Sequence, residues 1–594
     1  MSKYDAPLRD MRFAIYDVLD VESVYRRLPG CESATRDLLD AVLDEGAKFC
    51  QTVLAPLNKS GDAEGCHWEN GSVRTPKGFK DAYDQFVAGG WPSLVAEPEY
   101  GGQGLPESFG SVLKEMIDSA NLSWGTYPLL SHGATESLRQ VGSEWQREVF
   151  LKPIVDGSWT GTMCLTEPHC GTDLGLLKTR AEPAADGTYN VTGTKIFITA
   201  GEHDFTDNII HLVLARLPDA PAGTRGISLF IVPKLKVDQA GKATERNAVS
   251  CGSIENKMGI RGSATCVMNF DGAQGYLIGA PNKGLNAMFL MMNTARIAVG
   301  LQGLALIERA YQNSLAYARD RLQMRSLSGT KRPDKPADPI IVHPDIRRLL
   351  LTQKAFAEGG RVLAYYAYLQ ADIVAKSADE AERKRADELL GFLTPIVKAM
   401  LTEAAIECTN HALQVFGGHG YVKEWGMEQF VRDARITTIY EGTTQIQALD
   451  LLGRKIMGLQ AAGLRHFLGE VGAFCQAQSG NAALAEFVAP LARLAQEWEQ
   501  LTREVGEAAM KDPEQVGAAA VDYLYYSGYV TLAYFWAREI AALGPAHGED
   551  FRASKLATAR FWYQRIVPRT LAHVASIRAG SASLMAMTEA QFSP

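Results

Sequence analysis

The stretch Arg435-Ile-Thr-Thr-Ile-Tyr-Glu-Gly-Thr-Thr-Gln-Ile-Gln447 places one carboxylate, Glu441, between an aromatic residue and a glycine. The residues before it are β-prone, so we expect the acid to follow a strand. A carboxylate packed there loses hydration, which raises its pKa toward the range of a general base at neutral pH. Gly442 has no side chain, so a ligand can approach the backbone beside the acid. Thr443 and Gln445 add polar groups suited to a heterocycle. A strand with an exposed glutamate at its tip explains the stretch equally well.

The length and composition indicate a globular protein with several domains. The chain has 594 residues, of which 46% are hydrophobic and 22% charged. This length exceeds what one hydrophobic core supports. The 60 Lys and Arg residues against 68 Asp and Glu residues give a net charge of −8, which argues against nucleic acid as the main partner.

The sequence also bears on membranes and metals. No apolar run approaches the roughly 18 residues of a membrane span, and the first residues lack a signal-peptide pattern. We therefore expect a cytoplasmic protein without a membrane span. The nine cysteines include no Cys-x-x-Cys and no His/Cys cluster at metal-ligand spacing, so we expect free thiols and no metal.

The pattern of apolar residues predicts an α+β fold with four domains. Helical spacing fills much of residues 1–160, which begin with a short arm, and β-rich runs fill residues 161–280. Helices resume in residues 281–460, which we expect to form an antiparallel bundle. One face there carries Val397, Leu401, Ala404, Cys408, Ala412 and Val415. Residues 461–594 are again helical, with a break at Asp512-Pro513 and a buried aromatic helix over 521–543.

Three more stretches carry groups suited to a ligand. Met163-Cys-Leu-Thr-Glu-Pro-His-Cys-Gly-Thr-Asp173 combines hydroxyl residues with a glycine, although a turn with Ser and Thr contacts explains it as well. Lys195-Ile-Phe-Ile-Thr199 presents Phe197 and Thr199 at the end of a strand, and the alternative is an ordinary half-buried strand. Gln414-Val-Phe-Gly-Gly-His-Gly420 closes a long helix with more glycine than a C-cap requires. Such backbone can meet a pyrophosphate.

Together these motifs indicate a family. In order, Thr-Glu-Pro-x-x-Gly-Thr-Asp, Phe-Ile-Thr, Gln-x-Phe-Gly-Gly-x-Gly and Ile-Tyr-Glu-Gly-Thr resemble those of the acyl-CoA dehydrogenase flavoenzymes. The arm and the final segment resemble those of its longer bacterial members. The resemblance implies an N-terminal helical domain, a middle β-barrel-like domain, a C-terminal four-helix bundle and an extra C-terminal helical domain. It also implies FAD bound across a subunit boundary of a homo-oligomer, for which we expect a dimer.

The resemblance assigns roles residue by residue. It makes Glu441 the catalytic base, because Ala295 stands where some relatives carry theirs. The implied FAD contacts are Met163, Leu165, Thr166, Phe197, Thr199, Arg321, Gln323, His343, Gln414, Gly417, Gly418, Thr443 and Gln445. The implied acyl-CoA contacts are Thr172, Asn293, Arg296, Tyr440 and Gly442. His169 and Cys170 replace smaller residues of the family pattern, which puts the acyl-chain specificity in doubt.

The implied reaction is the α,β-dehydrogenation of an acyl-CoA to a trans-2-enoyl-CoA, with an electron-transferring flavoprotein as acceptor. We expect a medium- or long-chain substrate of fatty-acid β-oxidation. The alternatives are 3-methylmercaptopropionyl-CoA as substrate, an acyl-CoA oxidase, and a DNA-binding flavoprotein of the same fold. The DNA-binding alternative is favoured by a run of basic residues with no acid among them: Arg552, Lys555, Arg560, Arg565, Arg569 and Arg578. Against it, residues 461–594 hold 11 basic and 13 acidic residues.

Overall fold

The computed structural model describes residues 4–593, without the side chain of residue 290. Two compact units form. The helical unit comprises Met1–Ala47, Glu107–Glu115 and Val299–Pro594, and the mixed unit comprises Lys48–Pro106 and Met116–Ala298. Two long helices, α6 (Glu107–Val141) and α9 (Gly284–Asp320), pass from one unit into the other. The two units cut across the four expected domains, whose boundaries stay a prediction.

The mixed unit contains a closed ring of five strands. β11 (Thr265–Ile278) pairs with β5 (Tyr189–Thr199), β5 with β4 (Arg180–Pro183), and β4 with β6 (Ile209–Arg216). β7 (Ile227–Pro233) pairs with both β6 and β11 and completes the ring. β10 (Val249–Ile254) and β3 (Thr160–Cys164) extend it at two edges. Register shifts in β11 bend that strand so that it reaches several partners. The expected barrel-like sheet is present.

Short helices and small hairpins complete the mixed unit. They are α4 (Ala55–Glu64), α5 (Phe79–Ala88), α7 (Glu144–Gln146), α8 (Lys152–Val155), β1 (His67–Glu69) with β2 (Ser72–Arg74), and β8 (Leu235–Val237) with β9 (Ala243–Arg246). Phe150 of the π-helical segment before α8, Leu212 of β6 and Met291 of α9 belong to one buried cluster. The barrel is thus packed against helices on its buried face.

The helical unit is built on α9, α10 (Pro344–Lys376) and α11 (Glu380–Phe416). α9 and α11 approach closely, because a Cβ at Gly300 or Gly303 would lie 2.7 or 2.6 Å from a backbone oxygen of α11. By length and composition α9 and α11 could each cross a membrane, but their apolar windows are 82% and 78% buried inside the protein. The bundle core therefore explains their hydropathy.

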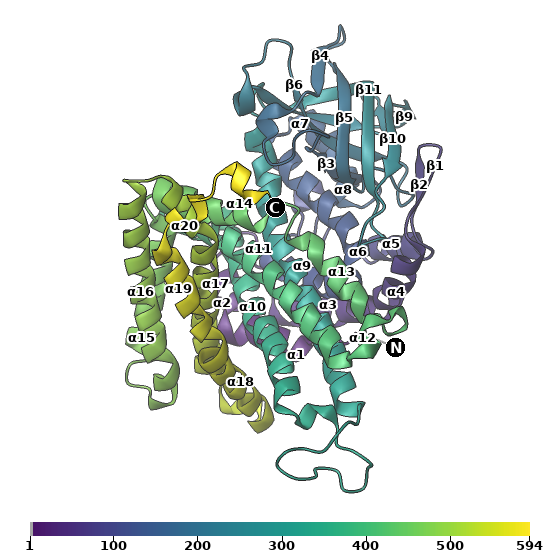
Figure 1. The fold of residues 1–594 in the computed structure, drawn as a ribbon. Coiled ribbons are helices and arrows are strands. Elements are labelled where there is room, and N and C mark those ends of the chain that lie inside the picture. The colour runs from purple at the N-terminus through teal and green to yellow at the C-terminus, as the bar shows by residue number, and fades with distance from the viewer. Residues whose placement is uncertain (1–3, 594) are drawn as a thin grey trace. The chain divides into compact units, whose positions relative to one another are not determined.

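Further helices surround these three. They are α1 (Leu8–Arg12), α2 (Val21–Tyr25), α3 (Arg36–Phe49), α12 (Gly418–Tyr421), α13 (Met427–Thr437), α14 (Thr444–Leu449), α15 (Ala462–Ala477), α16 (Ala485–Ala509), α17 (Glu514–Ala542), α18 (Glu549–Phe561), α19 (Thr570–Ala579) and α20 (Ala582–Met585). Figure 1 shows α15 to α19 beside α10 and α11, which α17 contacts directly. α17 begins just after Asp512-Pro513 and is the expected buried aromatic helix.

One expectation was wrong. The β-prone run that begins at Ile436 is not a strand but the last turn of α13 and the turn after it. The isoleucines and threonines there score as strand formers, but β propensity depends on neighbours in a sheet, which this segment lacks. Instead, Phe430, Ala434 and Thr437 form a buried helical face.

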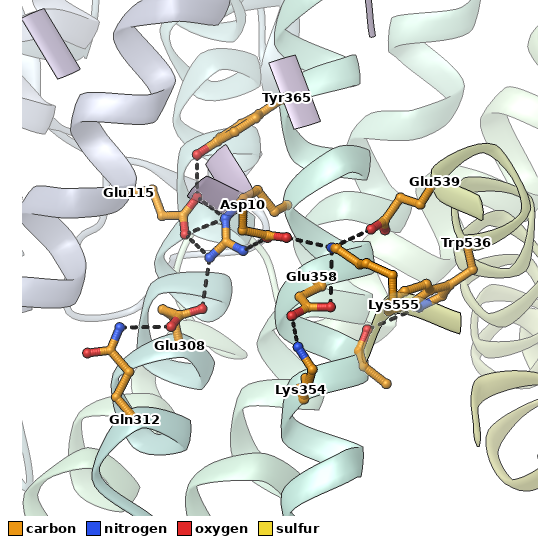
Figure 2. Close-up of polar contacts among 12 residues, drawn as sticks. Asp10, Glu115, Glu308, Gln312, Lys354, Glu358, Tyr365, Trp536, Glu539 and Lys555 are labelled. Carbon is orange, nitrogen blue, oxygen red and sulfur yellow. Dashed lines mark hydrogen bonds and ion pairs between the residues drawn. The ribbon is translucent and has the colours of Figure 1, made fainter. Parts of the chain in front are cut away.

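A buried ion network ties the N-terminal segment to the bundle (Figure 2). Arg361 of α10 is fully buried, and its guanidinium donates to Glu115 of α6 at 2.6 Å and to Glu308 of α9 at 2.8 Å. It also pairs with Asp10 of α1. Tyr365 adds a hydrogen bond to Glu115 at 2.5 Å. Burial raises the pKa of a carboxyl group, but Lys555 and Arg361 bring that of Asp10 well below its usual value.

The same network reaches the C-terminal helices through Lys555 of α18. Its ammonium group lies 2.6 Å from Glu539 of α17, 3.2 Å from Glu358 of α10 and 2.5 Å from Asp10 (Figure 2). Burial raises the pKa of Glu539 to about 7, although Lys555 opposes the shift. One lysine thus contacts carboxyl groups from three separate parts of the chain, of which Asp10 also pairs with Arg361 and Glu358 with Lys354.

Lys555→Met is expected to destabilise the protein by about 3–5 kcal/mol, because it removes the cation paired with buried Glu539 and one of the cations beside Asp10 and Glu358. The matched control is Arg560→Met, which removes the exposed pair between Arg560 and Glu486 at 2.8 Å and should cost no more than about 1 kcal/mol. Denaturant unfolding of both variants measures the difference. Equal stability of the two variants would show that Lys555 does not hold these helices together.

Candidate active site

Glu441 lies in a turn between α13 and α14 and has left-handed backbone. α13 ends at Thr437, and the N–H of Tyr440 donates to the Ile436 carbonyl oxygen at 3.1 Å. Glu441 then has φ 55° and Gly442 has φ 97°. Left-handed backbone costs a non-glycine residue roughly 1–2 kcal/mol, and such strain persists only where the surroundings enforce it. Contacts from outside the turn must therefore hold it.

Two side chains bind the carbonyl groups of this turn. Lys398 of α11 is buried and donates from Nζ to the Gly442 oxygen at 2.7 Å. Gln447 of α14 is also buried and donates from Nε2 to the Glu441 oxygen at 3.0 Å. A Cβ at position 442 would lie 2.6 Å from Gln447 Nε2, so the close approach and the positive φ both require glycine.

The residues on either side of the turn are fixed as well. The Tyr440 hydroxyl donates to Oε1 of Gln302, a buried residue of α9, at 2.5 Å. Thr443 is the N-cap of α14, and its side chain accepts a hydrogen bond from the Ile446 N–H at 3.4 Å. Gln445 is exposed in the first turn of α14. The helices α9, α11 and α14 therefore all contact residues 440–442.

A second group of expected site residues lies just beyond the end of α9. The Arg321 carbonyl accepts from the Ile340 N–H at 2.8 Å, and His343 Nε2 donates to the Gln323 carbonyl at 2.9 Å. These contacts bring Arg321, Gln323 and His343 together at the base of the loop 326–339. The side chains of Arg321 and Gln323 are exposed.

The glycine-rich segment after α11 offers open backbone. α11 ends at Phe416, and Gly417 follows with φ 57°. Gln414, Gly417 and Gly418 are exposed, and a Cβ on either glycine would meet nothing within 4 Å. The Tyr317 ring of α9 stacks on Phe416 with centroids 4.1 Å apart. This segment therefore has room for a ligand against its backbone.

In the mixed unit, a buried ion pair ties the loop after β3 to β5. Lys195 Nζ lies 2.9 Å from Glu167 Oε1 and donates to the Leu165 carbonyl at 3.0 Å. Burial alone raises the pKa of Glu167, but Lys195 and hydrogen bonds from Thr179 lower it to about 2. The Thr166 carbonyl accepts from the backbone N–H of residue 196 at 2.9 Å. The segment 163–167, which includes Met163, thus has a fixed place beside β5.

Phe197 lies in a β-bulge of β5. On β11, Met268 pairs with Lys195 and Cys266 pairs with Ile198, so one residue of β11 opposes two of β5. Phe197 has φ 59°, and 59% of its surface is exposed. An exposed ring on strained backbone is typical of a ligand site. Thr199 ends the strand, as the sequence predicts.

Three expected acyl-CoA contacts lie elsewhere in the mixed unit. Thr172 is exposed in the loop after β3, and Asn293 is exposed on α9. Arg296 of α9 is buried.

The residues that hold the site were not found from sequence. The sequence could have pointed to Lys398, because it lies inside the apolar run 393–401, and a lysine in such a place is seldom fully buried without a specific partner. Lys195 and Gln447 carried no such signal. The fold also brings Glu167, His169 and Cys170 within 4.8 Å of one another, a proximity that their spacing did not reveal. Glu167 already pairs there with Lys195.

Comparison with known proteins decides the family. Models of the N-terminal, middle and C-terminal domains of acyl-CoA dehydrogenase match residues 37–158, 162–273 and 282–457. A fourth, described as acetyl-CoA dehydrogenase C-terminal like, matches residues 467–588. The chain belongs to the acyl-CoA dehydrogenase family. It is an oxidoreductase of that type, and it has the family fold with an extra C-terminal domain.

Several family members resemble the whole chain. 3-Methylmercaptopropionyl-CoA dehydrogenase of Ruegeria pomeroyi is 44% identical over 574 residues, which cover 95% of this chain and 96% of that protein. The broad-specificity linear acyl-CoA dehydrogenase FadE5 of Mycobacterium tuberculosis is 33% identical over 619 residues, the full length of both. A butyryl-CoA dehydrogenase of Syntrophomonas wolfei is 33% identical over 610 residues, which cover 98% of each.

Solved structures of the family share the fold. Caenorhabditis elegans ACDH-11, in complex with C11-CoA, has a TM-score of 0.77 at 19% identity and covers 94% of this chain and 90% of its own. An acyl-CoA dehydrogenase of Bacillus anthracis complexed with FAD has a TM-score of 0.75 at 20% identity and covers 93% and 90%. Both matches extend over the C-terminal helices as well as the bundle.

Proposed function

We propose that this acyl-CoA dehydrogenase uses FAD to oxidise the α,β bond of an acyl-CoA thioester to a trans-2-enoyl-CoA, with Glu441 as the base. The observation that carries the proposal is the left-handed turn that presents Glu441 and is held by Lys398 and Gln447. The surrounding bundle fixes the backbone of Glu441 more firmly than a tip of chain at the surface would require.

The described residues fit FAD. In the mixed unit, the exposed ring of Phe197 suits contact with a flat heterocycle. In the helical unit, the open backbone at Gly417 and Gly418 suits a pyrophosphate. Arg321, Gln323, His343 and Gln414 stand at the same end of the bundle as further contacts. When bound, FAD supplies the acceptor for the hydride that leaves the substrate β-carbon.

The protein's own part of the reaction centres on Glu441. Its carboxylate takes the proton from the substrate α-carbon as the hydride leaves the β-carbon, so two C–H bonds break and one C=C bond forms. The backbone N–H of Glu441 donates to the thioester carbonyl, which stabilises the negative charge that develops on that oxygen. Gly442 supplies the positive φ of the turn after Glu441, and Gln447 Nε2 occupies the place that its Cβ would take.

For the acyl group we propose a short chain, with 3-methylmercaptopropionyl-CoA as the leading substrate. Similarity to the Ruegeria pomeroyi and Syntrophomonas wolfei dehydrogenases supports this choice over the medium or long chain that the sequence suggested. Beside Tyr440, Gln302 Nε2 is buried and has no hydrogen-bond partner among residues 4–593. A thioether sulfur is a weak acceptor for such a donor, whereas a methylene group is none.

Electrons leave to an electron-transferring flavoprotein in this proposal, and release of hydrogen peroxide would instead identify an oxidase. The pairing of the basic C-terminal run speaks against a DNA-binding role. Four of its six members pair with acids: Arg560 with Glu486, Arg569 with Glu407, Arg578 with Glu504, and Lys555 with Glu539. Cations already paired in this way have little charge to offer to phosphates. We also propose a homodimer.

Glu441→Gln is expected to keep bound FAD and affinity for acyl-CoA but to lose about 10³-fold or more in kcat, because an amide cannot accept the proton. Stopped-flow measurement of flavin reduction checks this. The control is Glu424→Gln, which removes an exposed carboxylate of the same bundle domain and should react at the wild-type rate. Near-normal turnover by Glu441→Gln would assign the base to another residue.

A comparison of two isosteric substrates tests the acyl group. 3-Methylmercaptopropionyl-CoA and pentanoyl-CoA differ only by sulfur in place of a methylene group. We expect kcat/KM to favour the thioether by about 10-fold, and Gln302→Leu to remove that preference, since one weak hydrogen bond contributes of the order of 1 kcal/mol. Higher kcat/KM for octanoyl-CoA than for either would support the medium-chain reading instead.

A further inference from the structure

The backbone around Glu441 is held by two donors that act on consecutive carbonyl groups. Lys398 Nζ donates to the Gly442 oxygen at 2.7 Å, and Gln447 Nε2 donates to the Glu441 oxygen at 3.0 Å. Both peptide groups belong to residues with positive φ. The two bonds therefore fix the orientation of the peptide planes directly after the residue whose carboxylate and N–H the reaction uses.

Burial of the Lys398 side chain costs free energy. This side chain is fully buried in the middle of α11, and an ammonium group loses its hydration there. Val397 and Leu401 on either side belong to the apolar core stripe, so packing alone is satisfied by an aliphatic side chain. At this position the cation makes a charge-assisted hydrogen bond to the turn, which is stronger than a neutral one and which an aliphatic side chain cannot make.

Gln447 has the matching role on the other side of the turn. Its Nε2 donates a hydrogen bond to the Glu441 carbonyl, while its Oε1 is buried and has no hydrogen-bond partner in the described part of the chain. An amide with one half unsatisfied stabilises the fold less than an apolar side chain of the same size. The favourable contribution of this amide is therefore its hydrogen bond to the Glu441 carbonyl in the turn.

We propose that Lys398 and Gln447 are positioning residues for the reaction: together they clamp the turn so that the Glu441 carboxylate and N–H keep one geometry toward the substrate. The inference rests on the proposed role of Glu441 as the base. Neither residue touches the reacting atoms in this account. They act through the peptide groups of Glu441 and Gly442, so their loss should impair the chemical step rather than the binding of ligands.

The test uses the full-length protein with FAD bound. Lys398→Met keeps the length and apolar stem of the side chain but removes the donor. A misplacement of about 1 Å in an active site can cost about 10²-fold, so we expect kcat to fall by about that factor. FAD content and the Kd for a non-reacting acyl-CoA analogue should change less than about threefold, because most of the expected FAD and acyl-CoA contacts lie outside the turn.

An isotope effect separates positioning from general structural damage. With the α-carbon of the substrate deuterated, the primary isotope effect on kcat should increase in Lys398→Met, since proton removal becomes slower relative to the other steps. The control is Thr409→Val, which removes a buried hydroxyl of α11 that donates only to carbonyls of its own helix. Its kcat and isotope effect should equal those of the wild type.

Lys398→Met with FAD bound and wild-type kcat would overturn the proposal, and so would a slower variant whose isotope effect is unchanged. If Lys398→Met does not accumulate as folded protein, Gln447→Leu decides. It removes one donor and also one unsatisfied acceptor, so the fold should tolerate it. A loss of kcat with an increased isotope effect supports the clamp, and wild-type kinetics contradict it.

The failure of the clamp can be told apart from the failure of the proposed function. Activity in Glu441→Gln would contradict the proposed function itself, whereas an inactive Glu441→Gln beside a fully active Lys398→Met would contradict only the clamp.

Discussion

The helical unit has to hold two consecutive residues, Glu441 and Gly442, in left-handed backbone at the end of a short helix. A local sequence cannot enforce this, because the conformation is unfavourable for glutamate. Three other helices supply the contacts that do: α11 through Lys398, α14 through Gln447, and α9 through Gln302, which binds Tyr440. The position of the acid is therefore a property of the bundle as a whole.

The bundle keeps these contacts because its own helices are locked together. Gly300 and Gly303 let α9 approach the backbone of α11 closely. Arg361 of α10 and Lys555 of α18 bind carboxylates from α1, α6, α9, α10 and α17. The N-terminal arm and the C-terminal helices are thereby integral to the helical unit. Buried ion pairs of this kind add little net stability, but removing one partner is costly, so they specify one arrangement.

Much of the fold could be predicted from the sequence, because its signals are local. Helical spacing in residues 281–460 and the aromatic run 521–543 indicated helices that the structure contains as α9, α10, α11 and α17, and the stretch Lys195–Thr199 indicated the end of β5. The segment at Ile436 failed because isoleucine and threonine favour strands only beside other strands. The motifs likewise pointed to Glu441 and Phe197, but their left-handed backbone arises from distant contacts. Lys398 and Lys195 stayed hidden because their partners lie 44 and 28 residues away in the sequence, and Gln447 because its partner is a backbone carbonyl, which any residue type offers.

The central claim is that a bundle-held glutamate removes a proton from a thioester while FAD takes the hydride. The most direct measurement is an anaerobic single turnover, in which purified protein is mixed with an acyl-CoA and both flavin colour and product are followed. The account predicts that the yellow flavin bleaches and that one trans-2-enoyl-CoA forms for each flavin reduced. A protein that is colourless and cannot be reconstituted with FAD, or a flavin that keeps its colour with every acyl-CoA offered, would contradict it.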